Sequence, residues 1–278
     1  MRSLRELLDA LPLPAAAAGG LPEYVLPSAS LLGGDLPPGH LHVWSGPPGA
    51  GKTAFLLGLL HDAARHGRPA VLATYDLSAS SLALRLLAMS SGVAVHDMEE
   101  MVASGRTPST NAVASAAARA RARLALLPLY VLEARGMSVS SIEDRLVRSP
   151  VRAEVLGVDF LEAVVRPPET PVEGALADLS DLASRRFVSV VCVTREGVLD
   201  RAVVPDRSRA DRVGRIAPAG CESAAGIAPA TGLTGRDRRV DATLLANRHG
   251  IAVTCRLRVD ADAARLLPDD PAPAARPG

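Results

Sequence analysis

The sequence predicts an α/β fold in which helices cover both faces of a mostly parallel sheet. Short apolar runs alternate with helix-length segments from about residue 40 onward, which is typical of consecutive strand–helix–strand units. A glycine-rich turn, SGPPGAGKTA at 45–54, joins the first of these runs to the first long helix. Near the carboxyl terminus, two apolar stretches separated by a short polar turn indicate an antiparallel hairpin.

A short helix is predicted at the amino terminus. Four leucines there fall at i, i+3, i+4 and i+7 and form one apolar stripe: Leu4, Leu7, Leu8 and Leu11. Residues 12–38 are rich in proline, alanine and glycine and indicate a linker. The stripe must therefore pack either on the chain's own core or on a neighbouring subunit.

Strands and helices then alternate in order. Helices are expected at 52–66, 78–89, 109–127, 138–149 and 175–185, with Ser78 as a cap of the second. Strands are expected at 41–45, 70–75, 129–133 and 187–194, and 153–164 indicates a strand running into a loop. The hairpin pairs 240–247 with 251–259. We assign 1–30 to the short helix and linker, 31–262 to the main domain, and 263–278 to a proline-rich disordered tail.

Composition excludes several classes of protein. Among 278 residues, 31 are basic and 30 acidic, so no global field draws the chain to nucleic acid or to a membrane. No apolar run reaches membrane-spanning length, and Glu6 and Asp9 interrupt the apolar region that a signal peptide needs. Cys192, Cys221 and Cys255 lack metal-ligand spacing. We expect them to be buried, reduced thiols of a cytoplasmic protein.

Residues 46–53 carry a phosphate-binding pattern. The run Gly46-Pro47-Pro48-Gly49-Ala50-Gly51-Lys52-Thr53 matches G-x-x-x-x-G-K-[ST] between a predicted strand and a predicted helix. Its glycines let backbone N–H groups face phosphates, and the helix N-terminus adds its dipole. Lys52, the single lysine of the chain, would reach the β- and γ-phosphates as a catalytic cation, and the Thr53 hydroxyl would ligate Mg²⁺. The sequence therefore predicts an ATP site over Gly46–Ala54.

Asp159 is a candidate second ligand for that metal. It ends the apolar run 155–158, and the carboxyl end of a parallel strand borders the crevice where ligands bind. A carboxylate there can hold the Mg²⁺ ion or its water shell.

Residues 37–93, which include both the glycine-rich turn and the stretch YDLSASSLALRLLAM, resemble the ATPase domain of DnaB-type replicative helicases. Segments 127–148, 155–164 and 244–260 follow in the family's order, and the resemblance is thin between 196 and 240. It implies a RecA-like P-loop fold, a hexameric ring, and ATP hydrolysis coupled to movement along single-stranded DNA or to duplex unwinding. The family's amino-terminal domain has no counterpart in the sequence, and residues 1–12 resemble the linker helix that docks on the adjacent subunit.

The resemblance also implies roles for single residues. Asp76 occupies the position of the glutamate that orients the attacking water; it is one methylene shorter, and a displacement of about 1 Å can lower the rate about 10²-fold. Arg248 matches the arginine finger that acts on the neighbouring subunit, whereas Ala246 stands where the family has a lysine. Thr194-Arg195 replaces a Ser/Thr-Gln sensor. Arg195 is either a contact for the γ-phosphate or a simple surface charge.

A basic segment covers residues 200–239, where eight arginines against five acidic residues give a net charge of +3. In RecA-like rings this segment supplies loops that grip the DNA backbone in a salt-dependent way. The alternative is a solvated loop whose mixed charges pair with one another. Two functions therefore remain: a DnaB-like ATPase acting on single-stranded DNA, or a catalytically weakened ATP-binding regulatory or scaffold protein without helicase activity.

Overall fold

The fold is built on one ten-stranded sheet with the order β1-β4-β3-β5-β6-β2-β7-β8-β9-β10. A computed structural model describes residues 1–12, 36–104, 111–164, 172–195, 212–218, 238–247, 254–260 and 262–268. The six central strands are parallel, and the outer strands on both sides run antiparallel. This arrangement confirms the predicted α/β class, the mostly parallel sheet and the carboxyl-terminal hairpin.

The parallel strands are short, and the residues of the five that precede residue 200 are mostly buried. They are β4 (Leu129–Glu133), β3 (Ala70–Thr74), β5 (Val155–Asp159), β6 (Ser189–Arg195), β2 (Leu41–Gly46) and β7 (Arg212–Pro218). Because successive side chains of a strand point to opposite faces, β2 places Val43 in one core cluster and Trp44 in the other. Burial on both faces explains why the strands appear in the sequence as continuous apolar runs.

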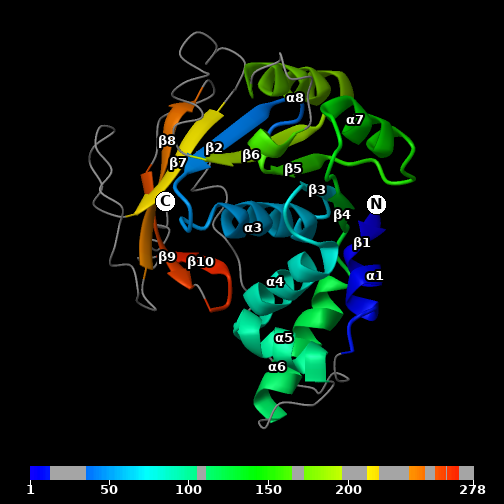
Figure 1. The fold of residues 1–278 in the computed structure, drawn as a ribbon, viewed down its shortest axis with the longest axis vertical. Helices are drawn as coiled ribbons and strands as arrows, with labels where there is room; N and C mark the ends of the chain where they lie inside the picture. The colour runs from blue at the N-terminus through cyan, green and yellow to red at the C-terminus, as the bar shows by residue number, and fades with distance from the viewer. Residues whose placement is uncertain are drawn as a thin grey trace, which may run out of the picture.

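Helices cover both faces of this sheet (Figure 1). Helix α3 (Lys52–Arg65) packs on one face, and α7 (Val139–Val147) and α8 (Val172–Arg186) pack on the other. Gly157 of β5 lets α3 approach closely, since a Cβ at this position would lie 2.7 Å from a methyl carbon of Leu60. A single turn of 3₁₀ helix, η1 (Leu161–Ala163), follows β5.

Three further helices extend the α3 side of the molecule: α4 (Ala79–Ser91), α5 (Val95–Ser104) and α6 (Asn111–Leu124). Ser78 caps α4 as predicted, because its hydroxyl accepts a hydrogen bond from the Ser81 amide at 3.1 Å. Helix α5 was not predicted from the sequence. No helix in the described part of the chain is both long and apolar enough to span a bilayer.

The amino terminus packs on the chain's own core. Strand β1 (Arg2–Ser3) forms the edge of the sheet and pairs with β4, and α1 (Leu4–Asp9) follows at once. Ser3 and Glu6 form a reciprocal capping box at its first turn. Leu4, Leu7 and Leu8 are buried, and α1 contacts α4 and α6. The structure therefore shows the leucine stripe packed on the chain's own core, which is the first of the two alternatives.

The carboxyl-terminal hairpin consists of β8 (Arg238–Asn247) and β9 (Thr254–Asp260), and β10 (Arg265–Pro268) pairs with β9. The prediction of disorder for 263–278 is therefore wrong at β10. Ala263 is only 1% exposed, Leu267 packs against the main core, and Arg265 forms a 2.9 Å ion pair with Asp260. These contacts hold β10 against β9 and the main core.

Part of the basic segment 200–239 also belongs to the sheet. Arg212 and Arg215 lie in β7, and Arg238 and Arg239 begin β8. The remainder of that segment lies outside the described residues. An account of 200–239 as one continuous loop is therefore wrong, although both expectations for its charges stay untested.

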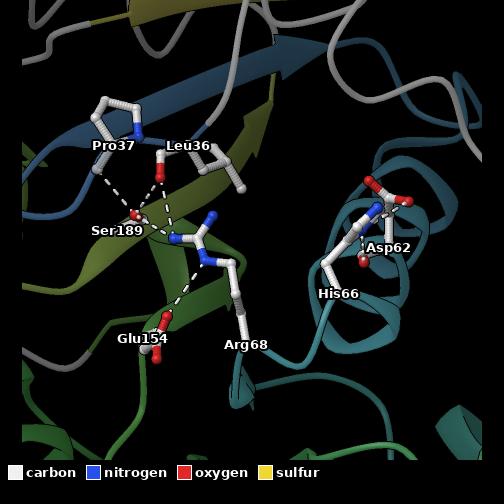
Figure 2. A network of polar contacts seen from close by, with 7 residues as sticks. All are labelled: Leu36, Pro37, Asp62, His66, Arg68, Glu154 and Ser189. Carbon is white, nitrogen blue, oxygen red and sulfur yellow. Dashed lines mark hydrogen bonds and ion pairs between the residues drawn. The ribbon is translucent and has the colours of Figure 1, made fainter.

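A polar network holds the chain where it approaches β2 (Figure 2). The Arg68 guanidinium donates to the Leu36 carbonyl at 3.0 Å and to the Ser189 hydroxyl at 3.2 Å, and it contacts Glu154 at 3.4 Å. The Ser189 hydroxyl in turn lies 3.0 Å from the Leu36 carbonyl and 2.9 Å from the Pro37 carbonyl. These residues precede or begin β3, β5, β6 and β2. The network therefore fixes the amino-terminal edge of the parallel strands.

Candidate functional site

The candidate site lies at the opposite, carboxyl-terminal edge of the parallel strands, where the glycine-rich turn links β2 to α3. Gly49 and Gly51 have φ values of 77° and 85°, in the left-handed region that residues with a Cβ rarely adopt. Gly51 is also the N-cap of α3, and its carbonyl accepts from the Phe55 amide at 2.8 Å. The turn therefore has the curled backbone expected from its glycines, and it leads directly into a helix N-terminus.

Lys52 lies inside this turn and is only 6% exposed. Its ammonium donates to the Gly46 carbonyl at 2.9 Å and to the Pro47 carbonyl at 2.8 Å. The Phe160 ring centroid is 5.9 Å away, within reach of a cation–π interaction. A compact ammonium fits such an enclosed position, whereas the wide planar fork of an arginine does not.

Thr53 and Asp159 meet beside Lys52. The Thr53 hydroxyl lies 3.1 Å from one carboxylate oxygen of Asp159 and 3.4 Å from the other. Asp159 is 0% exposed at the end of β5. Burial raises the pKa of its carboxyl group to about 6; the nearby charge of Asp76 raises it further, while the Thr53 hydrogen bond and the charge of Lys52 oppose the rise. A buried carboxylate with a raised pKa gains most from a cation that compensates its charge.

These two side chains fit a magnesium ion. A hydroxyl and a carboxylate are the hard oxygen ligands that Mg²⁺ prefers, and Mg²⁺ in nucleotide sites takes one or two protein ligands beside phosphates and water. Within the described ranges, no three His, Cys, Asp or Glu side chains gather into a metal cluster. A metal here would therefore depend on Thr53, Asp159 and the nucleotide together.

Asp76 lies on an exposed turn after β3, close enough to Asp159 for its charge to affect that carboxyl group. The Tyr75 amide donates to the Asp159 carbonyl at 2.9 Å, which ties this turn to β5. Arg135, just beyond β4, donates to the carbonyls of Tyr75 at 3.4 Å and of Asp76 at 3.2 Å. Burial raises the pKa of Tyr75 to about 12, and its hydroxyl donates to the Met137 carbonyl at 3.0 Å. The turn that carries Asp76 is therefore held by strands on both of its sides.

The end of β6 completes the edge. Arg195 pairs in register with Gly46, the first residue of the phosphate-binding pattern. Its amide donates to a carboxylate oxygen of Glu162 at 2.5 Å. Neither Glu162 nor Arg135 was predicted from the sequence. Their one sequence signal is that each closely follows a predicted parallel strand.

Other residues predicted from the sequence lie elsewhere in the fold or outside the described part of the chain. Arg248 falls outside the described residues. Ala246 lies in β8 opposite Val213 of β7. Cys192 is buried and free, as predicted, and burial raises the pKa of its thiol. Within one chain, the structure therefore brings together Lys52, Thr53, Asp159 and the turn of Asp76.

A glycine-rich turn between a central parallel strand and a helix, with a buried carboxylate two strands away, defines a RecA-like P-loop domain. The family model described as "DnaB-like helicase C terminal domain" matches residues 30–194, more than half of the chain. The chain belongs to this family.

Two solved structures share the fold. One is titled "The Structure Of A DnaB-Like Replicative Helicase And Its Interactions With Primase". Its TM-score is 0.66 at 13% sequence identity, and the match covers 84% of this chain and 58% of the other. The other, described as an ATPase domain, has a TM-score of 0.65 and 13% identity over 83% of this chain and 85% of its own. The chain thus spans little more than half the length of the first of these proteins. No curated protein matches the sequence significantly.

Proposed function

We propose that the carboxyl-terminal edge of the sheet binds ATP with Mg²⁺. The observation that carries this proposal is the meeting of Lys52, Thr53 and Asp159 within one enclosed site. Lys52 would exchange its two carbonyl contacts for phosphate oxygens, and the α3 N-terminus would face the same oxygens. Thr53 and Asp159 would hold the metal, which when bound offsets the negative charge of the phosphates.

Hydrolysis would use Asp76 to orient water. Its turn is anchored to β5 and to Arg135, so the carboxylate is held at the edge of the crevice and is exposed to solvent. We further propose that copies of the chain assemble as a hexameric ring in which Arg248 reaches the site of the next copy. Membership of the DnaB-like family supports this assembly and the use of hydrolysis to move along single-stranded DNA.

A second function is favoured by the shorter carboxylate of Asp76 and by the alanine at 246. Both remove reach or charge from the positions that accelerate hydrolysis in the family. In this alternative the chain binds ATP but converts it slowly, and serves as a regulatory or scaffold protein whose shape depends on the bound nucleotide.

Three measurements on the full chain test these proposals together: ATP binding by calorimetry, phosphate release with and without single-stranded DNA, and particle mass with and without nucleotide. We expect binding in Mg²⁺, release stimulated by DNA, and loss of both in Lys52→Ala. Lys52→Arg keeps the charge and is the matched control for fit inside the turn. Binding without any DNA-stimulated release supports the second function, and absence of binding refutes both.

A further inference from the structure

We infer that Arg195 is a second cation for the terminal phosphate of the bound nucleotide, contributed by β6 of the same chain and held in place by Glu162. This inference rests on the proposed nucleotide site. It assigns Arg195 the first of the two roles that the sequence left open.

The sheet register places Arg195 beside the phosphate-binding turn. Arg195 pairs with Gly46, and Thr194 pairs with Ser45, on adjacent parallel strands. Along β6, Val193 belongs to the core cluster that contains α3, and Cys192 belongs to the cluster that contains α8. Because side chains alternate along a strand, Arg195 projects toward the α3 side, where Lys52 begins the helix.

The two neighbours differ in what they can offer a phosphate. Thr194 falls on the α8 side, is 0% exposed, and its hydroxyl has no hydrogen-bond partner among the described residues. Arg195 is exposed, and within the same ranges its guanidinium makes no hydrogen bond or ion pair. An exposed guanidinium beside a glycine-rich turn can bind phosphate oxygens with two parallel hydrogen bonds.

Glu162 holds the backbone of Arg195 in place without neutralising the charge of its guanidinium. One carboxylate oxygen accepts from the Arg195 amide at 2.5 Å, so the acid is bound to the backbone and not to the side chain. The charge of Glu162 also contributes to the raised pKa of Cys192, and η1 packs against α8 and β6. Glu162 therefore lies on the α8 side of the sheet. The guanidinium stays available on the other side.

The other oxygen of Glu162 is buried and has no hydrogen-bond partner among the described residues. A buried acceptor left without a donor is costly. A positioning role for this acid at the end of β6 would account for that cost. Glu162 is then a positioning residue that acts through the Arg195 backbone.

This arrangement predicts selectivity for a triphosphate over a diphosphate. Lys52 and the turn would hold the phosphates nearest the helix, whereas Arg195 lies one strand away from the turn and would reach only the last phosphate. A charge-assisted contact of this kind corresponds to about a tenfold difference in affinity.

The test compares ADP with the non-hydrolysable analogue AMP-PNP in Mg²⁺ by calorimetry on the full chain. We expect Arg195→Ala to weaken analogue binding about tenfold and ADP binding less than about twofold, with Arg195→Lys in between. Arg148→Ala, an exposed arginine just past the end of α7, is the matched control and should change neither affinity. Thermal unfolding followed through Trp44, the single tryptophan, verifies that each variant is folded.

Glu162 supplies the second arm of the experiment. Glu162→Ala should lower the analogue-to-ADP preference toward that of Arg195→Ala, and Glu162→Gln should restore it, because an amide oxygen also accepts the Arg195 N–H. A preference that is unchanged in Arg195→Ala, or an equal loss for both nucleotides, overturns the role of Arg195 and leaves the nucleotide site standing. Failure of the unmodified chain to bind either nucleotide overturns both.

Discussion

Replacing Asp159 by asparagine should stabilise the protein in the absence of nucleotide. The carboxyl group is completely buried, and burial raises its pKa from 3.8 to about 6. The folded state therefore binds the proton more tightly than the unfolded state does. Stability falls as the pH rises from about 4 to about 6, and above that range the whole penalty is present. The two pKa values correspond to about 3 kcal/mol of unfolding free energy near pH 7.5.

Asparagine keeps the shape of the side chain and an acceptor for the Thr53 hydroxyl, so it removes the penalty with little repacking. We expect Asp159→Asn to be more stable by about 2–3 kcal/mol at pH 7.5, and by about 1 kcal/mol at pH 4.5. The corresponding rise in midpoint temperature is on the order of 5–10 °C at pH 7.5. Unfolding followed by the fluorescence of Trp44 at both pH values measures this difference. The same variant should lose Mg²⁺-dependent nucleotide binding.

Asp76→Asn is the matched control, because it removes an exposed carboxylate at the same edge of the sheet. It should stabilise the chain much less than Asp159→Asn does at pH 7.5, because the charge of Asp76 is a smaller cause of the raised pKa of Asp159 than burial is. A variant Asp159→Asn that is no more stable than the natural chain, or whose gain does not depend on pH, would refute the reasoning. The buried acid would then carry no penalty that a cation could relieve.

Four further predictions concern packing and catalysis. Gly157→Val should lower the unfolding free energy by about 1–3 kcal/mol in urea titrations, because its methyl groups would collide with the leucines of α3; an unchanged midpoint would contradict the close approach of helix and strand. Ser189→Ala should cost about 1–3 kcal/mol by removing the hydrogen bonds that its hydroxyl makes with the Pro37 carbonyl and with Arg68, and an unchanged unfolding free energy would contradict this. Leu8→Ala should cost about 2–5 kcal/mol independently of protein concentration, whereas a concentration-dependent loss would place α1 on another subunit. Asp76→Glu should raise ATP turnover, by up to about 10²-fold, without altering nucleotide affinity, and a lower rate would argue against its role in orienting water.

The regular elements were predictable where the signal is local. Strand β4 matches its predicted range at both ends, and Ser78 caps the helix that it precedes, as predicted. The elements that the sequence did not reveal are β1, α5, β7 and β10. Two of these, β1 and β7, are strands paired with segments far away in the sequence, and such pairing leaves little trace in a strand's own residues. Strand β1, with two residues, is too short to carry any periodicity.

The residues of the candidate site likewise fall into those that the sequence predicted and those that it did not. The contiguous pattern at 46–53 identified Lys52 and Thr53, and the end of an apolar strand identified Asp159. Arg135 and Glu162 became visible only through the strand order, because β4 and β5 flank β3, and β5 lies beside β6. Side chains that support a site through backbone contacts have no fixed spacing from the motif. Sequence patterns alone therefore find the groups that would touch the nucleotide before they find the groups that position them.

The difference between lysine at position 52 and arginine at position 195 fits the access that each side chain has to the proposed site. All basic residues but one are arginine in this chain, and the exception is almost completely enclosed, with its ammonium 2.8 Å and 2.9 Å from two carbonyls of the turn. A guanidinium there would have to displace the backbone that shapes the turn. At position 195 the side chain is exposed at the sheet edge, where a broad, permanently charged fork has room to approach a phosphate from outside. An arginine would therefore not fit at position 52, beside the phosphates nearest the helix. At position 195, beside the last phosphate, an arginine has the room that it needs.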